Sequence, residues 1–376
     1  MGWTATDLSA GPGNVMGQPN PIAYLTPDGT RHVVHLGYSP SIPAFNSAII
    51  QWYFRRDGSD SGAIDLMIGD DDAKPAQGYP SAYYYAAQGT QHVVTGISGL
   101  FGHLQEFWYD GDWHSHDLTA ATGAPLASTL PHGYDFEPFG AHNQHIIYGD
   151  TNSHIHELTY TDSSWNSYDL TNSAAGAPPT VGDPFGYPFD EQQTQHVIYR
   201  GPGRNGGDLH ELWWSRVNGW THEPLSQQTG APPAASEPFG YVFESQGTQH
   251  VLYVGSDRHV YELWWDSTGW HLEDLTGHAG APLAAGAVHA YPFDPAPNVP
   301  DPTQHVIYIG GDDHLHELWW NNRGWHHQDL STVAGTTAPL SYPSAAPTGF
   351  ADTADGTQHI YYVDVDHHLI ALNWTA

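Results

Sequence analysis

The sequence predicts a seven-bladed β-propeller, an all-β ring of four-stranded antiparallel blades in which the N-terminal strand completes the last blade. Two observations predict this fold. A His within a short apolar run recurs about every 50 to 60 residues, at His32, His92, His145, His196, His250, His305 and His359. In addition, the last repeat ends one strand early, and the N-terminus carries the missing strand. We therefore expect a single domain over residues 1–376.

The clearest repeat spans residues 248–286 and reads TQHVLYVGSDRHVYELWWDSTGWHLEDLTGHAGAPLAAG. It contains three β-rich runs, at 250–254, 259–265 and 270–275, separated by the turn sequences Gly-Ser-Asp and Ser-Thr-Gly. A fourth run precedes them at 240–243. Four strands joined by hairpins are typical of a propeller blade.

Segments that read Gly-Ala-Pro follow the fourth run of several repeats, for example at 230–232 and 280–282. They fall where the chain must cross from the outer strand of one blade to the inner strand of the next, and Gly and Pro suit such turns. The expected blades are approximately 15–68, 75–119, 128–171, 182–226, 236–276, 287–331, and 345–376 together with 1–9.

The two ends of the chain share the last repeat. The segment 368–374 is followed by the end of the chain, without the Gly-Trp strand that the other repeats carry. Residues 2–8, GWTATDL, copy residues 269–275, GWHLEDL. An open solenoid would instead need polar capping repeats, whereas closure of a ring removes the exposed sheet edges. We therefore expect the N-terminal strand to close the ring.

The charge of the chain restricts its partners. Against 9 Lys and Arg there are 41 Asp and Glu, which gives a formal net charge of -32. Such a field repels phosphate backbones and anionic membranes, so we expect no nucleic-acid partner. No apolar run approaches the roughly 18 residues of a membrane span, and the N-terminus lacks the pattern of a signal peptide. We expect no membrane insertion and a soluble protein, cytoplasmic or secreted without a conventional signal peptide.

Three positions recur inside the predicted blades: a His on the second strand, a Glu on the third and a Trp that opens the fourth. The His and Glu pairs of blades two to six are His92 with Glu106, His145 with Glu157, His196 with Glu211, His250 with Glu262, and His305 with Glu317. The Trp series is Trp3, Trp113, Trp165, Trp220, Trp270 and Trp325. Blade one has Gln51 at the Glu position, Ile64 in place of the Trp and an insertion at 38–46, and blade seven has Ala371 at the Glu position. Up to five complete pockets are expected.

A carboxylate, an imidazole and an indole in one pocket suit a neutral sugar. The anion accepts hydrogen bonds from hydroxyls, and the indole covers an apolar C–H face of the sugar. A structural interpretation competes with this one, because Trp and Tyr can wedge between blades while His and Glu satisfy each other. The structural interpretation is favoured for any single His, whereas both stay open for the Glu and Trp taken together. The Leu and the first Trp of each Leu-Trp-Trp run are expected in the core.

The remaining chemical motifs favour neither a metal nor a cofactor. The chain has no Cys, which excludes thiolate ligands and Cys nucleophiles. Neighbouring His residues such as His326 and His327 point to opposite faces of a strand and rarely share an ion. The glycine-rich segment 201–207 connects two strands with no following helix, so we interpret it as a hairpin loop rather than a phosphate cradle. We predict no metal site, no cofactor and no catalytic residue.

The pattern Thr-Gln-His-Val-x-Tyr, His-x-x-Glu-Leu-Trp-Trp, Gly-Trp, Asp-Leu-Thr and Gly-Ala-Pro resembles the fucose-binding seven-bladed propeller lectins of the Photorhabdus luminescens lectin (PLL) family, over essentially the whole chain. The chain is more distantly similar to six-bladed fungal fucose lectins, in which an Arg takes the place of this His. The resemblance implies sugar binding by the Glu series and by Trp113, Trp165, Trp220, Trp270 and Trp325. It also implies fucosylated glycans on cells or glycoproteins as partners, with O-methylated glycans as an option, and a homo-oligomer.

Three functions fit a propeller with these features. A multivalent lectin expects near-equivalent motifs in many blades, which the sequence has. A propeller glycosidase would need one singular set of paired carboxylates, and only the divergent stretch with Arg55, Arg56, Asp57, Asp60 and Asp65 is singular. A protein-protein interaction propeller would use loops on one face. We predict a non-catalytic lectin, with the interaction propeller as the alternative and the glycosidase third.

Overall fold

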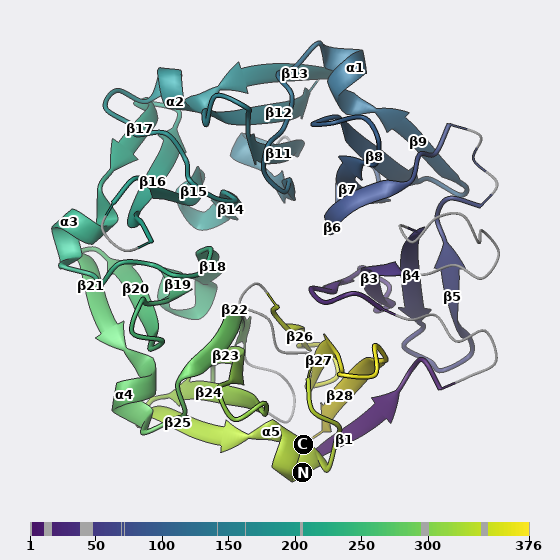
Figure 1. Cartoon of the computed structure of the whole chain (residues 1–376), viewed down its shortest axis with the longest axis vertical. Helices are drawn as coiled ribbons and strands as arrows, with labels where there is room; N and C mark the ends of the chain where they lie inside the picture. Colours follow the sequence, from purple (N-terminus) through teal and green to yellow (C-terminus); the bar gives the residue numbers. More distant parts are fainter. Residues whose placement is uncertain are drawn as a thin grey trace.

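The computed structural model describes residues 2–10, 17–37, 48–68, 70, 72–140, 142–161, 163–203, 206–294, 301–339 and 345–375. Seven four-stranded antiparallel sheets form a closed ring around a central channel (Figure 1). This confirms the predicted seven-bladed β-propeller. The insertion expected at 38–46 lies outside the described residues.

Within each blade the strands follow chain order from the channel to the rim. The innermost strands are β2 (Ile22–Leu25), β6 (Ala76–Tyr85), β10 (His132–Phe136), β14 (Phe185–Phe189), β18 (Phe239–Phe243), β22 (Ala284–Phe293) and β26 (Thr348–Asp352). The second strands are β3 (Arg31–Gly37), β7 (Thr90–Ile97), β11 (Asn143–Gly149), β15 (Thr194–Gly201), β19 (Thr248–Val254), β23 (Thr303–Gly310) and β27 (Thr357–Val363).

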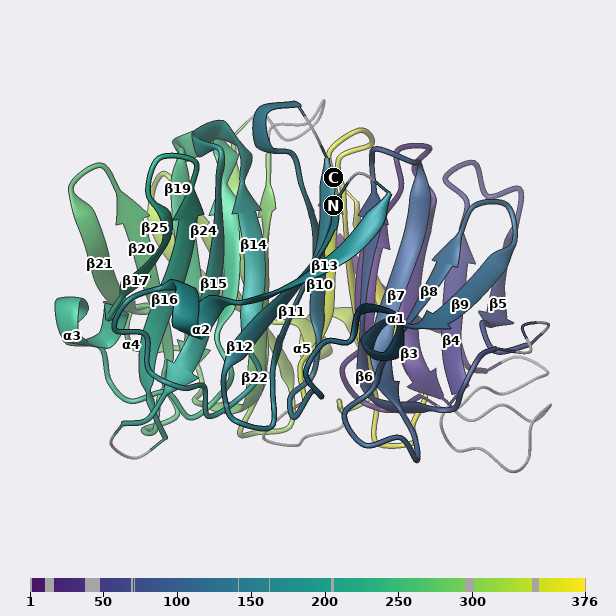
Figure 2. The same ribbon diagram turned by 90° about the horizontal axis from the view of Figure 1, so that it is seen from above.

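The outer half of each blade holds the third and fourth strands. The third strands are β4 (Ala48–Phe54), β8 (Leu104–Tyr109), β12 (Ile155–Thr161), β16 (Asp208–Ser215), β20 (Val260–Asp266), β24 (Leu315–Asn321) and β28 (Leu369–Thr375). The fourth strands are β5 (Ser61–Asp65), β9 (Trp113–Asp117), β13 (Ser164–Asp169), β17 (Gly219–Glu223), β21 (Gly269–Asp274), β25 (Gly324–Asp329) and β1 (Gly2–Asp7). Figure 2 shows the ring from the side, with β5 and β21 at its periphery.

The N-terminal strand completes blade seven. Strand β1 pairs with β28 in antiparallel register, with Trp3 opposite Trp374. The corner after β1 is built as in other blades: the Nδ1 atom of His368 lies 2.7 Å from Oδ2 of Asp7, as that of His259 lies 2.8 Å from Oδ2 of Asp274. The predicted closure of the ring is therefore confirmed.

A short helix follows the fourth strand of five blades, where the sequence suggested only a turn. These helices are α1 (Leu118–Thr122), α2 (Leu170–Ser173), α3 (Leu225–Thr229), α4 (Leu275–Ala279) and α5 (Leu330–Ala334). In α4, Asp274 caps the helix by accepting the backbone N–H of Gly277. The hydroxyl of Thr276 accepts the N–H of Val260. The Asp-Leu-Thr motif thus ties the outer strand to the third strand. Single turns of 3-10 helix, η1 (Pro138–Gly140), η2 (Asp190–Gln192) and η3 (Glu244–Gln246), follow three inner strands. All helices among the described residues fall well short of the length and apolar character needed to traverse a lipid bilayer.

Neighbouring blades are joined by a repeated hydrogen bond buried between them. A Tyr hydroxyl on the innermost strand of one blade donates to the Oε1 of a Gln on the second strand of the next blade, at 2.5 to 3.1 Å. The six pairs are Tyr24 with Gln91, Tyr83 with Gln144, Tyr134 with Gln195, Tyr187 with Gln249, Tyr241 with Gln304, and Tyr291 with Gln358. In the seventh interface, between blades seven and one, Phe350 replaces the Tyr and lies opposite His359. Arg31 replaces the Gln.

The central channel is lined by a belt of aromatic and imidazole rings. The ring centroids of His132 and Phe185 lie 3.8 Å apart, those of Phe185 and Phe239 4.7 Å, and those of Phe239 and His289 4.4 Å. These rings border a cavity of about 370 Å³. Burial lowers the pKa of His132 and of His289 to about 3, so both rings are neutral near pH 7.

Candidate functional site

The recurrent His of each second strand is buried, and in blades two, four, five and six it is held on three sides. In blade four, the Nδ1 atom of His196 lies 2.8 Å from Oε1 of Glu211, and its Nε2 atom lies 2.8 Å from the hydroxyl oxygen of Thr194. The imidazole also stacks on Tyr187, with centroids 5.3 Å apart. A carboxylate only accepts, so Nδ1 of His196 carries a proton and donates it to Glu211. The His therefore orients the Glu.

The same His and Glu contact occurs in all five predicted pairs, with Nδ1 to Oε1 distances of 2.7 to 2.9 Å. The two residues are not directly opposite each other. In blade four, His196 pairs with Trp213, and Glu211 pairs with Ile198. Because alternate residues share a face of the sheet, His196, Glu211 and Trp213 all lie on the face that looks toward blade five.

The pocket between blades four and five combines residues from both blades and has a volume of about 290 Å³. From blade four it is lined by His196, Glu211 and Trp213, and from blade five by Gln249, Trp265 and Trp270. The Glu of one blade thus faces the fourth-strand Trp of the following blade, and not the Trp of its own blade.

The repeated register carries this arrangement around the ring. Packing between blades supports it, because these Trp residues join hydrophobic clusters with residues of the preceding blade. Trp165 and Trp220 pack against the clusters that contain Tyr83 and Phe136, and Trp325 and Trp3 belong to those of Phe243 and Tyr291. The complete pairs are therefore Glu106 with Trp165, Glu157 with Trp220, Glu211 with Trp270, Glu262 with Trp325, and Glu317 with Trp3. The number of complete Glu and Trp pairs is therefore five, and Trp3 belongs to one of them. Trp113 faces Gln51 and has no Glu partner.

The Leu-Trp-Trp runs correct one expectation. Leu212 is fully buried in the core, as predicted, but Trp213 is half-buried and borders the pocket. In two other blades the first Trp stacks on a His of the fourth strand. The ring centroids lie 4.0 Å apart for Trp264 and His271, and 4.2 Å apart for Trp319 and His326. The prediction of a core position was wrong because the face that looks to the next blade remains partly open at this radius of the ring.

The fourth-strand Trp residues differ in access. Trp113, Trp165, Trp220 and Trp270 are half-buried, whereas Trp3 and Trp325 are only 8% exposed. A half-buried indole at a pocket keeps part of one ring face available for a ligand. The pockets that contain Trp165, Trp220 and Trp270 together with a Glu therefore offer the most accessible combination.

The carboxylates have different electrostatic surroundings. Burial alone would raise the pKa of Glu106, but hydrogen bonds from His116 and His92 outweigh it and leave this pKa lowered. Both oxygens are engaged, since His116 Nε2 lies 2.9 Å from Oε2. In blade five, Glu273 lies opposite Glu262, and burial together with the charge of Glu262 raises the pKa of Glu273. Glu211 and Glu223 form a similar cross-strand pair in blade four.

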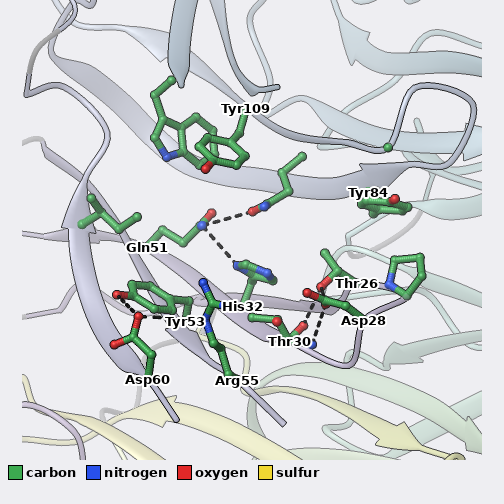
Figure 3. Close-up of a pocket in the computed structure, with 15 residues that line it drawn as sticks. Thr26, Asp28, Thr30, His32, Gln51, Tyr53, Arg55, Asp60, Tyr84 and Tyr109 are labelled. Carbon is green, nitrogen blue, oxygen red and sulfur yellow. Dashed lines mark hydrogen bonds and ion pairs between the residues drawn. The ribbon is translucent and has the colours of Figure 1, made fainter. Parts of the chain in front are cut away.

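The pocket between blades one and two is larger, at about 620 Å³, and lacks a Glu (Figure 3). Gln51 Nε2 lies 3.1 Å from Nδ1 of His32 and 3.2 Å from Oε1 of Gln91. Without a carboxylate partner, burial lowers the pKa of His32 to about 4, although the charge of Asp28 partly opposes this shift. The register also corrects the assignment of Ile64, which lies opposite Gln51. Ser61, opposite Phe54, holds the Trp position.

Blade seven presents a third version of the pocket. Ala371 lies opposite Tyr361, which is the Glu position of the other blades, as the sequence predicted. Asn373 lies opposite His359, and its Oδ1 atom is 2.7 Å from the imidazole Nδ1. A pocket of about 310 Å³ opens here between blades seven and one.

Gln249 and Trp265, which the following blade contributes to the pocket, were not among the residues predicted from the sequence. A signal for them exists in the sequence. In Thr-Gln-His and Leu-Trp-Trp, neighbouring residues must face opposite sides of a strand. Once His is assigned to one interface, the adjacent Gln belongs to the other, and the same alternation separates the two Trp residues.

No protein-family model and no curated protein matches the sequence, so membership of the PLL family stays a prediction. Among solved structures, a complex of the Aleuria aurantia lectin with Fucα1-6GlcNAc is similar at 15% identity and a TM-score of 0.53, covering 79% of this chain and 91% of that chain. AofleA from Arthrobotrys oligospora is similar at 12% identity and a TM-score of 0.52, covering 100% and 87%. A polysaccharide lyase, an ulvan lyase, is similar at 11% identity and a TM-score of 0.53, covering 95% and 93%. These similarities establish a shared propeller fold.

Proposed function

We propose that the protein is a multivalent lectin that binds neutral sugars, fucose in particular, at the pockets between its blades. The observation that carries the proposal is the repetition around the ring of one Glu, oriented by a buried His and facing a Trp of the next blade. Repetition of a polar and aromatic set across five interfaces is expected of several equivalent binding sites. A single catalytic centre would not require it.

In each pocket we assign a separate task to each side chain. The carboxylate of Glu211 accepts hydrogen bonds from sugar hydroxyls, and its charge makes them stronger than bonds between neutral groups. Trp270 covers the apolar C–H face of the sugar, and Trp213 and Trp265 border the same space. The buried His196 acts through Glu211 by fixing the rotamer of the carboxylate. Direct contact between the His series and the sugar stays a prediction of the sequence analysis.

The comparisons support a fucosylated ligand. The similar structures include the Aleuria aurantia lectin in complex with α-methyl-L-fucoside and the SapL1 lectin in complex with α-methyl fucoside. A deoxy sugar such as fucose presents an apolar methyl group that suits an indole. Several weak sites on one rigid ring would gain avidity on a surface that carries many glycans. Partners would then be fucosylated, or O-methylated, glycans on cells or glycoproteins, and a homo-oligomer would add further valency.

A polysaccharide-cleaving enzyme is the second candidate. It is favoured by the paired carboxylates Glu262 and Glu273, the raised pKa of Glu273, and the similarity to an ulvan lyase. Against it, the carboxylate pair is not singular, because Glu211 and Glu223 form a similar pair in blade four. A protein-protein interaction propeller remains the alternative without a sugar. We propose that the protein is not an enzyme.

The test is a glycan array with the full chain, followed by calorimetry with free L-fucose. We expect fucosylated glycans among the bound set and more than one fucose per chain. A variant that carries Gln at Glu157, Glu211 and Glu262 together should keep its fold and bind fewer fucose molecules per chain, because only the pairs of Glu106 and Glu317 remain. An unchanged number of bound fucose molecules in this variant would contradict the assignment, and the absence of any glycan bound to the wild type would favour the interaction propeller. Product release from polysaccharides that requires Glu273 would favour the enzyme.

A further inference from the structure

The pocket between blades seven and one differs from the others at nearly every lining position. Only the His and the Thr that contacts its Nε2 atom are shared with the pocket between blades four and five. On the side of blade seven, Ala371 occupies the Glu position and Asn373 the position of the first Trp. On the side of blade one, Arg31 occupies the Gln position, Phe54 that of the second Trp or Tyr, and Ser61 that of the fourth-strand Trp. The recurrent Glu is absent from this pocket, whose carboxylates are Asp352 and Asp355, and a guanidinium takes the place of an amide.

The guanidinium of Arg31 has neutral partners only. Its NH1 atom lies 2.9 Å from Nδ1 of His359 and 3.2 Å from Oδ1 of Asn373, and its Cζ atom lies 5.5 Å from the ring centroid of Phe54. The arginines that form ion pairs within the described part of the chain are Arg55, Arg56 and Arg200, so Arg31 has no carboxylate within 4.0 Å. Burial and the charge of Arg31 lower the pKa of His359 to about 4, so the imidazole is neutral near pH 7. A half-buried cation without a counter-ion favours an anionic ligand.

The second arginine of this pocket is already neutralised. Arg56 NH2 contacts both carboxylate oxygens of Asp352, at 2.5 and 2.6 Å, and the Asp352 side chain is 3% exposed. Gly29 gives Arg56 the room for this contact: its φ is +82°, and a Cβ there would lie 2.3 Å from Arg56 Nε. Asp355 also borders the pocket, on its exposed side, and accepts a hydrogen bond from the Thr357 hydroxyl. Arg31 is thus the cation that remains for a ligand, with Asp355 as an opposing charge at the rim.

We propose that this pocket binds an anionic saccharide, whose carboxylate or sulfate group contacts Arg31. A guanidinium has five N–H donors in a planar fork that matches a carboxylate or sulfate ester. The contacts of Arg31 with His359 and Asn373 both involve NH1, so other donors remain for a ligand. The pocket volume of about 310 Å³ is close to the roughly 290 Å³ of the pocket between blades four and five. The saccharide part of this proposal rests on the proposed lectin function, and the anion part rests on Arg31.

The test compares the full chain with Arg31→Gln, which installs the amide that the other six interfaces carry. The probes are methyl β-D-glucuronide, a 3-sulfated methyl β-D-galactoside, the corresponding neutral glycosides, and inorganic sulfate. By calorimetry or NMR we expect the charged saccharides to bind at least tenfold more tightly than the neutral ones. Arg31→Gln should lose at least tenfold of that affinity. Arg323→Gln removes the same charge from an exposed turn and should have no effect.

Two further measurements sharpen the result. Asp355→Asn should strengthen binding of the charged probes, and added salt should weaken it, because both effects act on a partly exposed charge. The ratio between the glucuronide and the sulfated galactoside identifies which anion the pocket prefers. Equal affinity of the wild type and Arg31→Gln would overturn the proposal, as would binding of inorganic sulfate without binding of either charged saccharide. A lower number of bound fucose molecules in the variant with Gln at Glu157, Glu211 and Glu262 concerns the lectin function separately.

Discussion

The pocket between blades four and five and the pocket between blades seven and one occupy equivalent places in the ring, yet their chemistry is opposite. Both keep the buried His, with its Nε2 atom 2.8 Å from a Thr hydroxyl. The first then adds Glu211, Trp213 and Trp270, and the second adds Arg31, Asn373 and Ser61. The comparison shows that the backbone register and the His fix the geometry of a pocket, while the residues around them can vary without loss of the blade.

The largest expected effect is on the aromatic side of the first pocket. Trp270→Ala should weaken sugar binding there by about 3 kcal/mol, roughly 100-fold, as is typical when a central aromatic anchor is truncated. In calorimetry with free fucose, the number of sugars bound per chain should fall by one. Trp270→Phe keeps an apolar ring and should retain most of the affinity. An unchanged stoichiometry in Trp270→Ala would remove Trp270 from the site.

The next effect concerns the carboxylate that blade seven lacks. Glu211→Gln should weaken binding at the same pocket by about 2 kcal/mol, roughly 30-fold, because a charge-assisted hydrogen bond becomes a neutral one. The converse change, Gln51→Glu, should strengthen binding between blades one and two. Site-resolved NMR of fucose titrations measures both. If Gln51→Glu and Glu211→Gln shift affinity in the same direction, the carboxylate does not set the affinity.

A smaller effect is expected when the Tyr and Gln hydrogen bond between two blades is removed. The interface of blades seven and one lacks this bond. Tyr187→Phe leaves the buried Oε1 of Gln249 without its donor and should lower the free energy of unfolding by about 1 to 3 kcal/mol. Urea denaturation measures this change. Phe350→Tyr at the seventh interface adds a hydroxyl opposite Arg31 instead of a Gln and should bring no comparable gain. If neither Tyr187→Phe nor Phe350→Tyr changes the free energy of unfolding, the Tyr and Gln pairs do not stabilise the ring.

The smallest effect is the titration of single imidazoles. His32 and His359 have pKa values lowered to about 4, by burial in both cases and additionally by Arg31 for His359. The unfolded chain, with His near pH 6.5, takes up these protons first, so their contribution to stability is present above about pH 6.5 and is lost as the pH falls toward 4. Arg31→Gln should raise the pKa of His359 and leave that of His32 unchanged. Histidine NMR titration checks this, and an unchanged His359 would contradict the proximity of the guanidinium.

The sequence predicted the ring, the split last blade and the five His and Glu pairs, because strand periodicity and repetition are local signals. It did not predict which blade supplies the Trp to a given Glu. The alternation within Leu-Trp-Trp separates the two interfaces, but only the register of the fourth strand, with Trp270 opposite Trp265, assigns its Trp to one of them. It also misplaced Trp213 in the core and Ile64 at the Trp position, since the first depends on how far the sheets separate and the second on the exact register of β4 with β5.

The most direct test of the central proposal is a crystal structure of the full chain soaked with free L-fucose. We expect fucose between neighbouring blades, with a hydroxyl bonded to Glu157 or Glu211 and an apolar face against Trp220 or Trp270. We expect no fucose at Arg31. Fucose bound at Arg31, or bound only in the central channel, would contradict the assignment of the pockets.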